Sequence, residues 1–259
     1  MLRITSRGNP RLKEVARLLA SARERRKAGK CVLEGEHLIG AYAERFGPPE
    51  LLVVAEHCVG REAVSALAVH YAERTLVVAR PLFAELATLP AGVGILALIA
   101  APARPPAPAA DFCLLLEDVQ DPGNVGSMLR SAAAAGVAQV HLSRHCAFVW
   151  SPKVLRAAQG AHFHLELYED VDLATWGAGF VASGGRLAAT VARGGTPVFD
   201  APLGGRVAVA IGNEGAGLSA GLLALASCRV TIPMPGGTES LNAAAAAAVC
   251  LFECVRQRR

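Results

Sequence analysis

Short apolar runs, each followed by a helix-like segment, constrain the fold of this chain more than any other feature. The run Val207–Ile211 contains no polar residue, as expected of a strand that is covered on both faces. Strands that alternate with helices pair in parallel, so we predict an α/β fold, and ligands of such sheets bind beyond the carboxyl ends of the strands. In residues 111–259 the predicted strands are Phe112–Leu116, Gln139–Leu142, His164–Leu167, Leu187–Val191, Val207–Ile211 and Arg229–Ile232. The predicted helices are Val125–Ala135, Pro152–Ala158, Leu173–Ser183, a short helix after Leu218, and Leu241–Arg258.

A proline-rich segment, residues 101–110, divides the chain. It contains four prolines in ten residues and no side chain suited to a core, which is typical of a semi-rigid, extended linker. We therefore predict a domain at 1–100, a linker at 101–110 and a second domain at 111–259. The first domain shows the same alternation, so parallel pairing is expected there too. Its predicted strands are Cys31–Leu33, Leu51–Ala55, Leu76–Ala79 and Ile95–Ile99, and its predicted helices are Glu36–Arg45, Arg61–Tyr71 and Pro81–Leu86.

Positive charge is concentrated at the start of the chain. Residues 1–30 contain ten Lys or Arg and two acidic residues, although the net charge of the whole chain is only +4. This density predicts a basic helix that binds the phosphates of a polyanion and releases counterions, although on charge alone a solvated helix face explains it equally well. The segment contains no aromatic side chain, so contacts to phosphates are favoured over stacking on bases. The candidate residues for these phosphate contacts are Arg7, Arg11, Lys13, Arg23, Arg25, Arg26 and Lys27.

Composition excludes several classes of protein. A hydrophobic content of 53% is too high for a disordered chain, yet no stretch approaches the roughly 20 apolar residues of a membrane helix. The first residues lack the apolar run of a secretory signal. Seven cysteines form no C-x-x-C pair, which indicates reduced thiols rather than disulfides or a metal site; Cys250 and Cys254 are better explained as buried apolar residues. We expect a soluble cytoplasmic protein with no metal and no membrane partner.

Two loops after predicted strands carry unusual polar residues. In the first, Pro122 and Gly123 form a turn, Asn124 is expected at the N-cap of the next helix, and Arg130 follows on that helix, where it lies on the surface or binds a phosphate. The second, Gly212–Ser219, matches neither G-x-G-x-x-G nor a P-loop. Its Glu214 would repel a pyrophosphate at a helix N-terminus, so a nucleoside that carries positive charge fits better than a dinucleotide.

A third loop, Ile232–Asn242, enters a helix that begins with six alanines. Its Ser240 and Asn242 can form hydrogen bonds and cap the backbone. The alanine face would let a ligand or another backbone approach closely, although alanine is also simply the best helix former. Each loop alone is a weak signal, but three in this order within one α/β domain are specific.

Together these loops resemble the SpoU (TrmH-type) branch of the SPOUT RNA 2′-O-ribose methyltransferases. The matching motifs are N-x-G-x-x-x-R at Asn124–Arg130, G-N-E-G-x-G at Gly212–Gly217 and I-P-M…S-L-N at Ile232–Asn242. Two further segments, Leu33–Ile39 and Ser151–Ala161, are also similar to this family. The resemblance implies a Rossmann-like domain with a C-terminal trefoil knot, preceded by a small α/β RNA-binding domain. It also implies S-adenosyl-L-methionine as cofactor, RNA as substrate and a homodimer.

The resemblance also implies roles for individual residues. The backbone of Gly212, Ile232 and Leu241 would hold the adenosine. The full set of implied cofactor-binding residues is Thr190, Gly212, Asn213, Glu214, Gly215, Ile232, Met234, Ser240 and Leu241. The implied catalytic residues are Arg130, Asn124, Glu214, Ser240 and Asn242.

Ribosomal RNA is the favoured substrate, because a basic helix in a small N-terminal domain resembles rRNA-modifying members. The alternatives are a tRNA 2′-O-methyltransferase and a nonenzymatic RNA-binding protein with the same fold. A guanidinium is a poor base, so our hypothesis is that Arg130 holds the neighbouring phosphate and stabilises the developing alkoxide. The proton would leave through phosphate, water or Glu214. A dehydrogenase and a serine hydrolase are disfavoured, because G-x-G-x-x-G and G-x-S-x-G are both missing.

Overall fold

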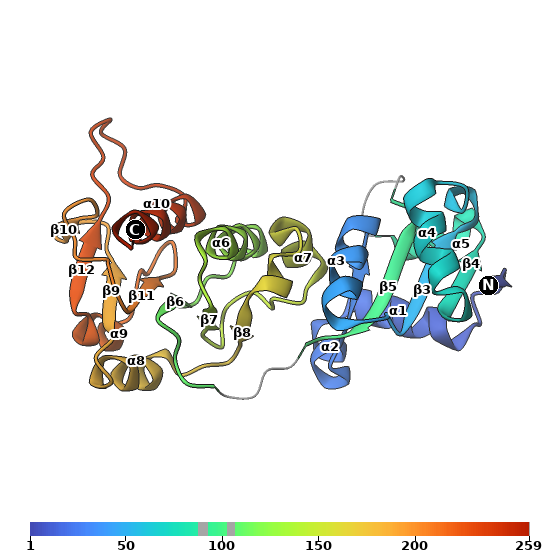
Figure 1. Ribbon diagram of the computed structural model, residues 1–259, viewed down its shortest axis with the longest axis horizontal. Helices are drawn as coiled ribbons and strands as arrows, with labels where there is room; N and C mark the ends of the chain where they lie inside the picture. Colours follow the sequence, from blue (N-terminus) through green and yellow to red (C-terminus); the bar gives the residue numbers. More distant parts are fainter. Residues whose placement is uncertain (88–92, 103–106, 259) are drawn as a thin grey trace. The chain divides into compact units, whose positions relative to one another are not determined.

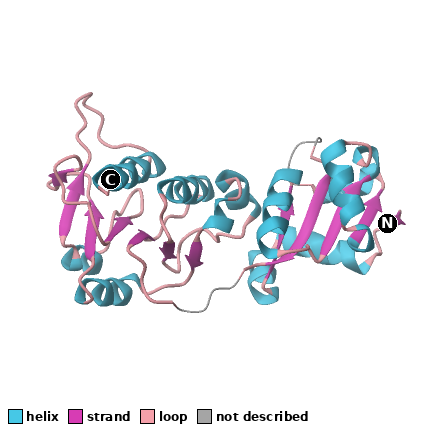
Figure 2. Cartoon of the chain, viewed as in Figure 1, coloured by secondary structure: helices cyan, strands magenta, loops and turns pink. Residues whose placement is uncertain are grey.

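A computed structural model describes residues 1–87, 93–102 and 107–258. Residues 103–106 of the predicted linker therefore lie outside the described residues. The chain divides into two compact units, Met1–Ala103 with Trp150–Arg156, and Arg104–Val149 with Ala157–Arg259. Each unit contains a sheet covered by helices (Figures 1 and 2), which confirms the predicted α/β fold. Within the described ranges, no helix is both long and apolar enough to cross a membrane.

The first unit has a five-stranded sheet in the order β1-β4-β3-β5-β2. The prediction of parallel pairing is wrong for β5, which runs antiparallel to both β2 and β3. Only the final residue of β5 is exposed, and the apolar run of a strand covered on both faces does not reveal its direction. The strands are β1 (Leu2–Ile4), β2 (Lys30–Glu34), β3 (Leu51–Ala55), β4 (Thr75–Val78) and β5 (Ile95–Ala100).

Two helices, not one, carry the basic residues at the start of the chain. Ser21 is extended (φ −131°, ψ 117°) and separates α1 (Pro10–Ala20) from α2 (Ala22–Ala28). Its hydroxyl accepts a hydrogen bond from the Glu24 N–H at 3.3 Å, so Ser21 caps the second helix. Apolar side chains of α1 and α5 share a core with β2, β3, β4 and β5. The other helical segments are α3 (Glu36–Phe46), α4 (Glu62–His70), α5 (Arg80–Leu86) and 3₁₀ turns at Glu56–Cys58 and Ala72–Arg74.

The second unit has a seven-stranded sheet in the order β10-β12-β9-β11-β6-β7-β8. Every pairing in it is parallel, as the sequence predicted. The carboxyl ends of β12, β9, β11 and β6 therefore lie next to one another at one edge of the sheet. The strands are β6 (Phe112–Leu116), β7 (Gln139–Leu142), β8 (Glu166–Tyr168), β9 (Arg186–Thr190), β10 (Thr196–Pro197), β11 (Val207–Ile211) and β12 (Cys228–Thr231).

Helices cover both faces of this sheet. The α6 and α10 helices lie side by side on one face, and α8 and α9 lie on the other (Figure 1). Apolar side chains of α8 and α9 pack on β6, β9 and β11. The helices of this unit are α6 (Pro122–Ala135), α8 (Leu173–Ala182), α9 (Ala220–Leu225) and α10 (Ala243–Gln257), with a 3₁₀ turn at Ala161–His164. Most of α7 (Pro152–Ala158) belongs to the first unit.

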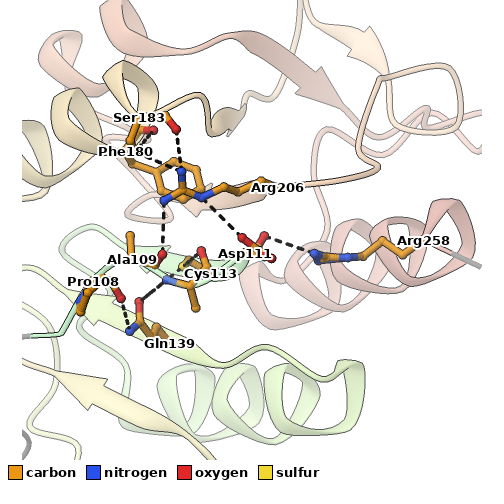
Figure 3. Close-up of polar contacts among 10 residues, drawn as sticks. Pro108, Ala109, Asp111, Cys113, Gln139, Phe180, Ser183, Arg206 and Arg258 are labelled. Carbon is orange, nitrogen blue, oxygen red and sulfur yellow. Dashed lines mark hydrogen bonds and ion pairs between the residues drawn. The ribbon is translucent and has the colours of Figure 1, made fainter.

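Side chains of the second unit hold the backbone that leads into β6 (Figure 3). The buried Gln139 amide accepts from the Ala110 N–H at 2.9 Å and donates to the Pro108 carbonyl at 3.0 Å. Arg206 donates to the Ala109 carbonyl at 3.2 Å. The residues before β6 are therefore fixed on the second unit although they lie within the predicted linker.

Candidate functional site

A cavity of about 570 Å³ opens at the carboxyl ends of β9, β11 and β12. Three chain segments form most of it: the end of β9, the loop after β11 and the loop between β12 and α10. Its lining residues are Thr190, Val191, Ala192, Ile211, Gly212, Asn213, Glu214, Gly215, Ala216, Gly217, Val230, Ile232, Met234, Glu239, Ser240, Leu241, Asn242, Ala243 and Ala246.

All nine residues predicted to bind the cofactor line this cavity. The parallel order β12-β9-β11 brings them together, because it places three strand ends at one edge of the sheet. Sequence reasoning missed Glu239 and Ala246, among others. The small residues at the start of α10 gave a signal for Ala246, whereas Glu239 lies between the recognised parts of the third motif.

The loop Gly212–Gly217 is closed by its own hydrogen bonds. Asn213 and Gly217 exchange both backbone hydrogen bonds, at 3.1 and 2.9 Å. The Asn213 Oδ1 accepts from the N–H groups of Gly215 and Ala216, at 2.9 and 3.0 Å. A Cβ at position 212 would lie 2.3 Å from the Gly217 carbonyl carbon, so only glycine fits there. The Asn213 side chain therefore shapes the loop from within.

The helix that carries the first motif begins earlier than predicted, and Asn124 is not its N-cap. Asp121 is the N-cap and accepts from the Asn124 N–H at 2.7 Å, while Pro122 occupies the first helical position. Both Asp and Asn are good N-caps, and proline at the first position favours the earlier start. As a result, the side chain of Asn124 is available for contacts outside its own helix.

Asn124 connects the three predicted loops. Its Nδ2 donates to the Glu214 carboxylate in the loop after β11. Its Oδ1 accepts from Asn242 Nδ2 at 2.9 Å, at the start of α10. Asn242 in turn caps α10, because its Oδ1 accepts from the N–H groups of Ala244 and Ala245. We call this series of hydrogen bonds, from Asn242 through Asn124 to Glu214, the amide relay.

Arg130 lies apart from the cavity lining. Its side chain is exposed on α6, and it has no hydrogen-bond or ion-pair partner among residues 1–87, 93–102 and 107–258. Of the other predicted catalytic residues, Glu214, Ser240 and Asn242 line the cavity, and Asn124 reaches two of them through the amide relay. The structure thus assembles four of the five predicted catalytic residues and leaves the Arg130 guanidinium exposed to solvent.

Comparisons with family models and with individual proteins identify one and the same family. Residues 111–252 match the model of the SpoU rRNA Methylase family, and residues 9–97 match an MRM3-like substrate binding domain. The chain is 31% identical to the 23S rRNA (guanosine(2553)-2′-O)-methyltransferase RlmP of Bacillus subtilis, over 97% of the chain and 98% of that protein. The chain belongs to the SpoU rRNA methylase family.

Solved structures of two similar methyltransferases superpose on this protein over nearly its whole length. The SpoU methyltransferase AviRb from Streptomyces viridochromogenes, in complex with AdoMet, superposes with a TM-score of 0.83 at 31% identity, over 96% of this chain and 98% of that one. The crystal structure of an RNA 2′-O ribose methyltransferase superposes with a TM-score of 0.84 at 30% identity, over 99% of each chain. The similarity therefore extends over both units.

The predicted RNA-binding residues lie in the first unit, and one of them is buried. Arg25 is only 6% exposed, and its guanidinium donates to the carbonyls of Leu18 and Leu19 at the end of α1. Burial also lowers the pKa of Arg25 from its ordinary value. The prediction that Arg25 contacts RNA is wrong, because its donors face the protein interior. The exposed members of the set are Arg7, Arg11, Lys13, Arg23, Arg26 and Lys27.

Proposed function

We propose that this protein transfers a methyl group from S-adenosyl-L-methionine to a ribose 2′-hydroxyl of RNA, with rRNA as the substrate. The observation that carries the proposal is the cavity at the strand ends, which the second and third family motifs line and to which the amide relay connects Asn124 of the first motif. The names of similar proteins from Bacillus subtilis and Streptomyces viridochromogenes support rRNA as the substrate.

The cavity suits S-adenosylmethionine in size and chemistry. Its volume, about 570 Å³, falls in the range of roughly 300–1,000 Å³ of small-molecule sites. Ile232, Met234 and Leu241 offer apolar surface to an adenine, and the carboxylates of Glu214 and Glu239 favour a cationic ligand. When bound, S-adenosylmethionine supplies a methyl group on a sulfonium, which is already a good leaving group.

Several residues of the cavity would hold this cofactor. Backbone groups of Gly212, Ile232 and Leu241 would bind the adenosine. The Thr190 hydroxyl donates to the Ala210 carbonyl at 2.8 Å, so Thr190 borders the cavity as a fixed wall. The other proposed cofactor contacts are Asn213, Glu214, Gly215, Met234 and Ser240.

The remaining chemistry falls to the protein side chains. Arg130 would bind the phosphate beside the target ribose and stabilise the developing alkoxide. It would not act as the base, because a guanidinium is a poor proton acceptor. The 2′-hydroxyl proton would leave through phosphate, water or Glu214. Asn124 and Asn242 would keep the Glu214 carboxylate in place, and Ser240 would orient the ribose.

The first unit would bind the RNA through its phosphates. Exposed cations on α1 and α2 supply the positive charge that phosphates require, and the match to a substrate binding domain over residues 9–97 supports this role. Ribosomal RNA is favoured over tRNA because relatives similar over nearly the whole chain are named for rRNA.

Three features of the assembled protein belong to the same proposal. A trefoil knot is supported by the return of the chain from β12, beyond β9, to α10 beside α6. A homodimer is supported by an apolar stripe on α10, where Phe252 is 49% exposed and lies in line with Ala245 and Ala248. A cytoplasmic location is supported by the rRNA substrates for which the relatives are named.

The test is methyl transfer from labelled S-adenosylmethionine to total bacterial RNA, by wild-type protein and by Arg130→Ala. We expect label in one rRNA size class, alkali-resistant at one position, and a loss of about 10²–10³-fold with Arg130→Ala. Label in tRNA instead would support the tRNA alternative. Cofactor binding without transfer to purified RNA would indicate that the substrate forms during ribosome assembly, and a second assay would then use assembly intermediates. Neither binding nor transfer would leave a nonenzymatic RNA-binding protein.

A further inference from the structure

Asp118, two residues beyond the end of β6, has an unusual backbone conformation. Its φ is +54°, in the left-handed region that non-glycine residues seldom occupy. Aspartate tolerates this region better than most residues, but the conformation persists only where the surroundings impose it. Asp118 does not line the cavity. Neither the family motifs nor the proposed mechanism gives it a role.

Ser143, which directly follows β7, holds Asp118 in this conformation. Its hydroxyl accepts from the Asp118 N–H at 2.8 Å and donates to Asp118 Oδ1 at 2.6 Å. The Ser143 backbone is itself fixed, because its N–H donates to the Leu116 carbonyl at 3.0 Å. One hydroxyl therefore secures both the backbone and the side chain of Asp118.

The conformation of Asp118 directs its carbonyl oxygen toward the loop Gly212–Gly217. That oxygen accepts from Asn213 Nδ2 at 2.9 Å. Asn213 Oδ1 is occupied by the N–H groups of Gly215 and Ala216, so the Asn213 side chain bridges Asp118 and the interior of the loop. Glu117 holds the other end of the loop, because its Oε2 accepts from the Ser219 N–H at 2.7 Å.

We propose that Ser143 and Asp118 are positioning residues that act through Asn213 to hold the loop Gly212–Gly217 in the shape that binds the cofactor. The inference rests on the proposed function, since it concerns the same cavity. The network reaches the loop from β6 and β7, on the side away from β9 and β12. Within the loop, the Glu214 side chain is held separately by Asn124. The network should therefore govern affinity for S-adenosylmethionine much more than the chemical step at saturating cofactor.

The experiment compares Ser143→Ala and Ser143→Thr in the full-length protein. We expect Ser143→Ala to raise the dissociation constant for S-adenosylmethionine, measured by calorimetry, by about tenfold, the size typical of one or two lost hydrogen bonds. The kcat at saturating cofactor should remain within about twofold of wild type. Ser143→Thr keeps the hydroxyl and should restore most of the affinity.

Variants of Asp118 test the backbone part of the inference. Asp118→Gly and Asp118→Ala both lose the carboxylate and keep the backbone carbonyl. Glycine adopts a positive φ without strain, whereas alanine resists this conformation. We therefore expect a smaller loss of cofactor affinity in Asp118→Gly than in Asp118→Ala. Equal losses in these two variants would contradict the role of the backbone conformation.

Ser227→Ala is the matched control. The Ser227 hydroxyl also accepts a hydrogen bond from the backbone of a strand, Leu187 N–H at 3.1 Å, but Ser227 does not line the cavity. Its loss should lower the melting temperature without weakening cofactor binding. If Ser143→Ala and Asp118→Ala behave like this control, the inference is wrong while the proposed function stands. If wild-type protein binds no S-adenosylmethionine, the proposed function fails and the inference with it.

Discussion

Asn124 shows how one side chain can connect three distant parts of a sequence. Its amide donates to Glu214, 90 positions further along the chain, and accepts from Asn242, 118 positions further along. An amide suits this place because it offers a donor to a carboxylate and an acceptor to another amide. Aspartate has nearly the same shape but offers no such donor.

Asn124→Asp should therefore damage the site without disturbing the helix. The new carboxylate would face the Glu214 carboxylate, and repulsion between like charges would push the two loops apart. We expect kcat/KM for methyl transfer at pH 7.5 to fall by about 10–100-fold, as for a lost hydrogen bond to a charged group. The helical circular dichroism signal should not change, because Asp121 remains the N-cap of α6. Unchanged kcat/KM would show that the amide relay has no part in turnover.

Arg130 allows a sharp test at the same scale, because its proposed role requires charge and not proton exchange. Arg130→Lys keeps the positive charge but loses the planar fork that binds a phosphate with two hydrogen bonds. We expect Arg130→Lys to retain measurable turnover at pH 7, well above that of Arg130→Ala. The check is single-turnover methyl transfer with both variants. Turnover as low as in Arg130→Ala, with RNA affinity unchanged, would contradict a purely electrostatic role.

At the scale of helices, the corner between α1 and α2 distinguishes a buried arginine from the exposed cations that we propose bind RNA. The chain turns at Ser21, and Arg25 reaches back to the carbonyls at the end of α1. Carbonyls at a helix end lack partners within the helix, so a buried guanidinium satisfies them well. Lys27, two residues later, is exposed.

Arg25→Met and Lys27→Met should therefore affect different properties, the first stability and the second RNA binding. Arg25→Met leaves buried carbonyls without their donor, and we expect the free energy of unfolding to fall by about 1–3 kcal/mol. Lys27→Met should change stability by no more than about 0.5 kcal/mol. It should instead weaken RNA binding and reduce the slope of log K against log salt by about one. Urea unfolding measures the change in stability, and filter binding at several salt concentrations measures the change in RNA affinity. If Arg25→Met lost RNA affinity without losing stability, the structural role of Arg25 would be refuted.

His141 on β7 makes the stability of the second unit depend on pH. The ring is 3% exposed, stacks on Tyr168 with 4.9 Å between centroids, and contacts Trp176. Burial lowers the pKa of His141 from 6.5 to about 4, although Glu166 opposes this shift. Between these two pH values the unfolded chain binds a proton that the folded protein does not. The contribution to stability is therefore complete above pH about 6.5 and is lost as the pH falls toward 4.

His141→Phe should remove this contribution to the pH dependence. Phenylalanine keeps an aromatic ring between Tyr168 and Trp176 and does not titrate. We expect the free energy of unfolding of wild type to decline more steeply between pH 6.5 and 4.5, by up to about 1.4 kcal/mol per pH unit relative to the variant. His162, whose pKa burial also lowers to about 4, is present in both proteins and cancels. Urea unfolding at four pH values tests this, and identical slopes would exclude His141 as the source.

Sequence patterns located most strands because a strand covered on both faces must be apolar along its whole length. The same patterns failed where little is buried. β1 and β10 are short and mostly exposed, so they were missed. The predicted parallel direction of β5 was wrong, because an apolar run that is buried on both faces does not show in which direction the strand runs. Ser21 separates the two basic helices because its hydroxyl caps α2, and a continuous charge pattern conceals such a break.

The site was predictable to a similar extent and for similar reasons. Motif spacing identified the loops, and parallel order brought their residues to one cavity. The amide relay was not predicted, because we expected Asn124 at the N-cap although Pro122 favours Asp121 there, and because hydrogen bonds between side chains so far apart in the chain leave no pattern in the sequence. Arg25 was misassigned because charge density says nothing about which side of a helix is buried.

At the scale of the whole molecule, the proposed function assigns RNA binding to the first unit and methyl transfer to the second, and the proposed homodimer would form through the second unit. The apolar stripe of α10 comprises Ala245, Ala248 and Phe252, at spacings of three and four residues; Ala245 and Phe252 are exposed and Ala248 is half-buried. Leu241, which lies just before the N-cap of α10, is 39% exposed and lines the cavity. A second copy seated on this stripe would therefore lie next to the cofactor site.

Phe252→Glu should convert the proposed dimer into a monomer, because it replaces the largest exposed side chain of the stripe with a charge. Phe199→Glu is the matched control, since Phe199 is 60% exposed but lies beyond β10, at the opposite edge of the sheet from β8. Sedimentation velocity should give a dimer for wild type and Phe199→Glu and a monomer for Phe252→Glu. Because the stripe adjoins the cavity through Leu241, methyl transfer by the monomer should also fall. A dimeric Phe252→Glu protein would place the interface elsewhere, and a fully active monomer would show that one copy of the chain completes the site.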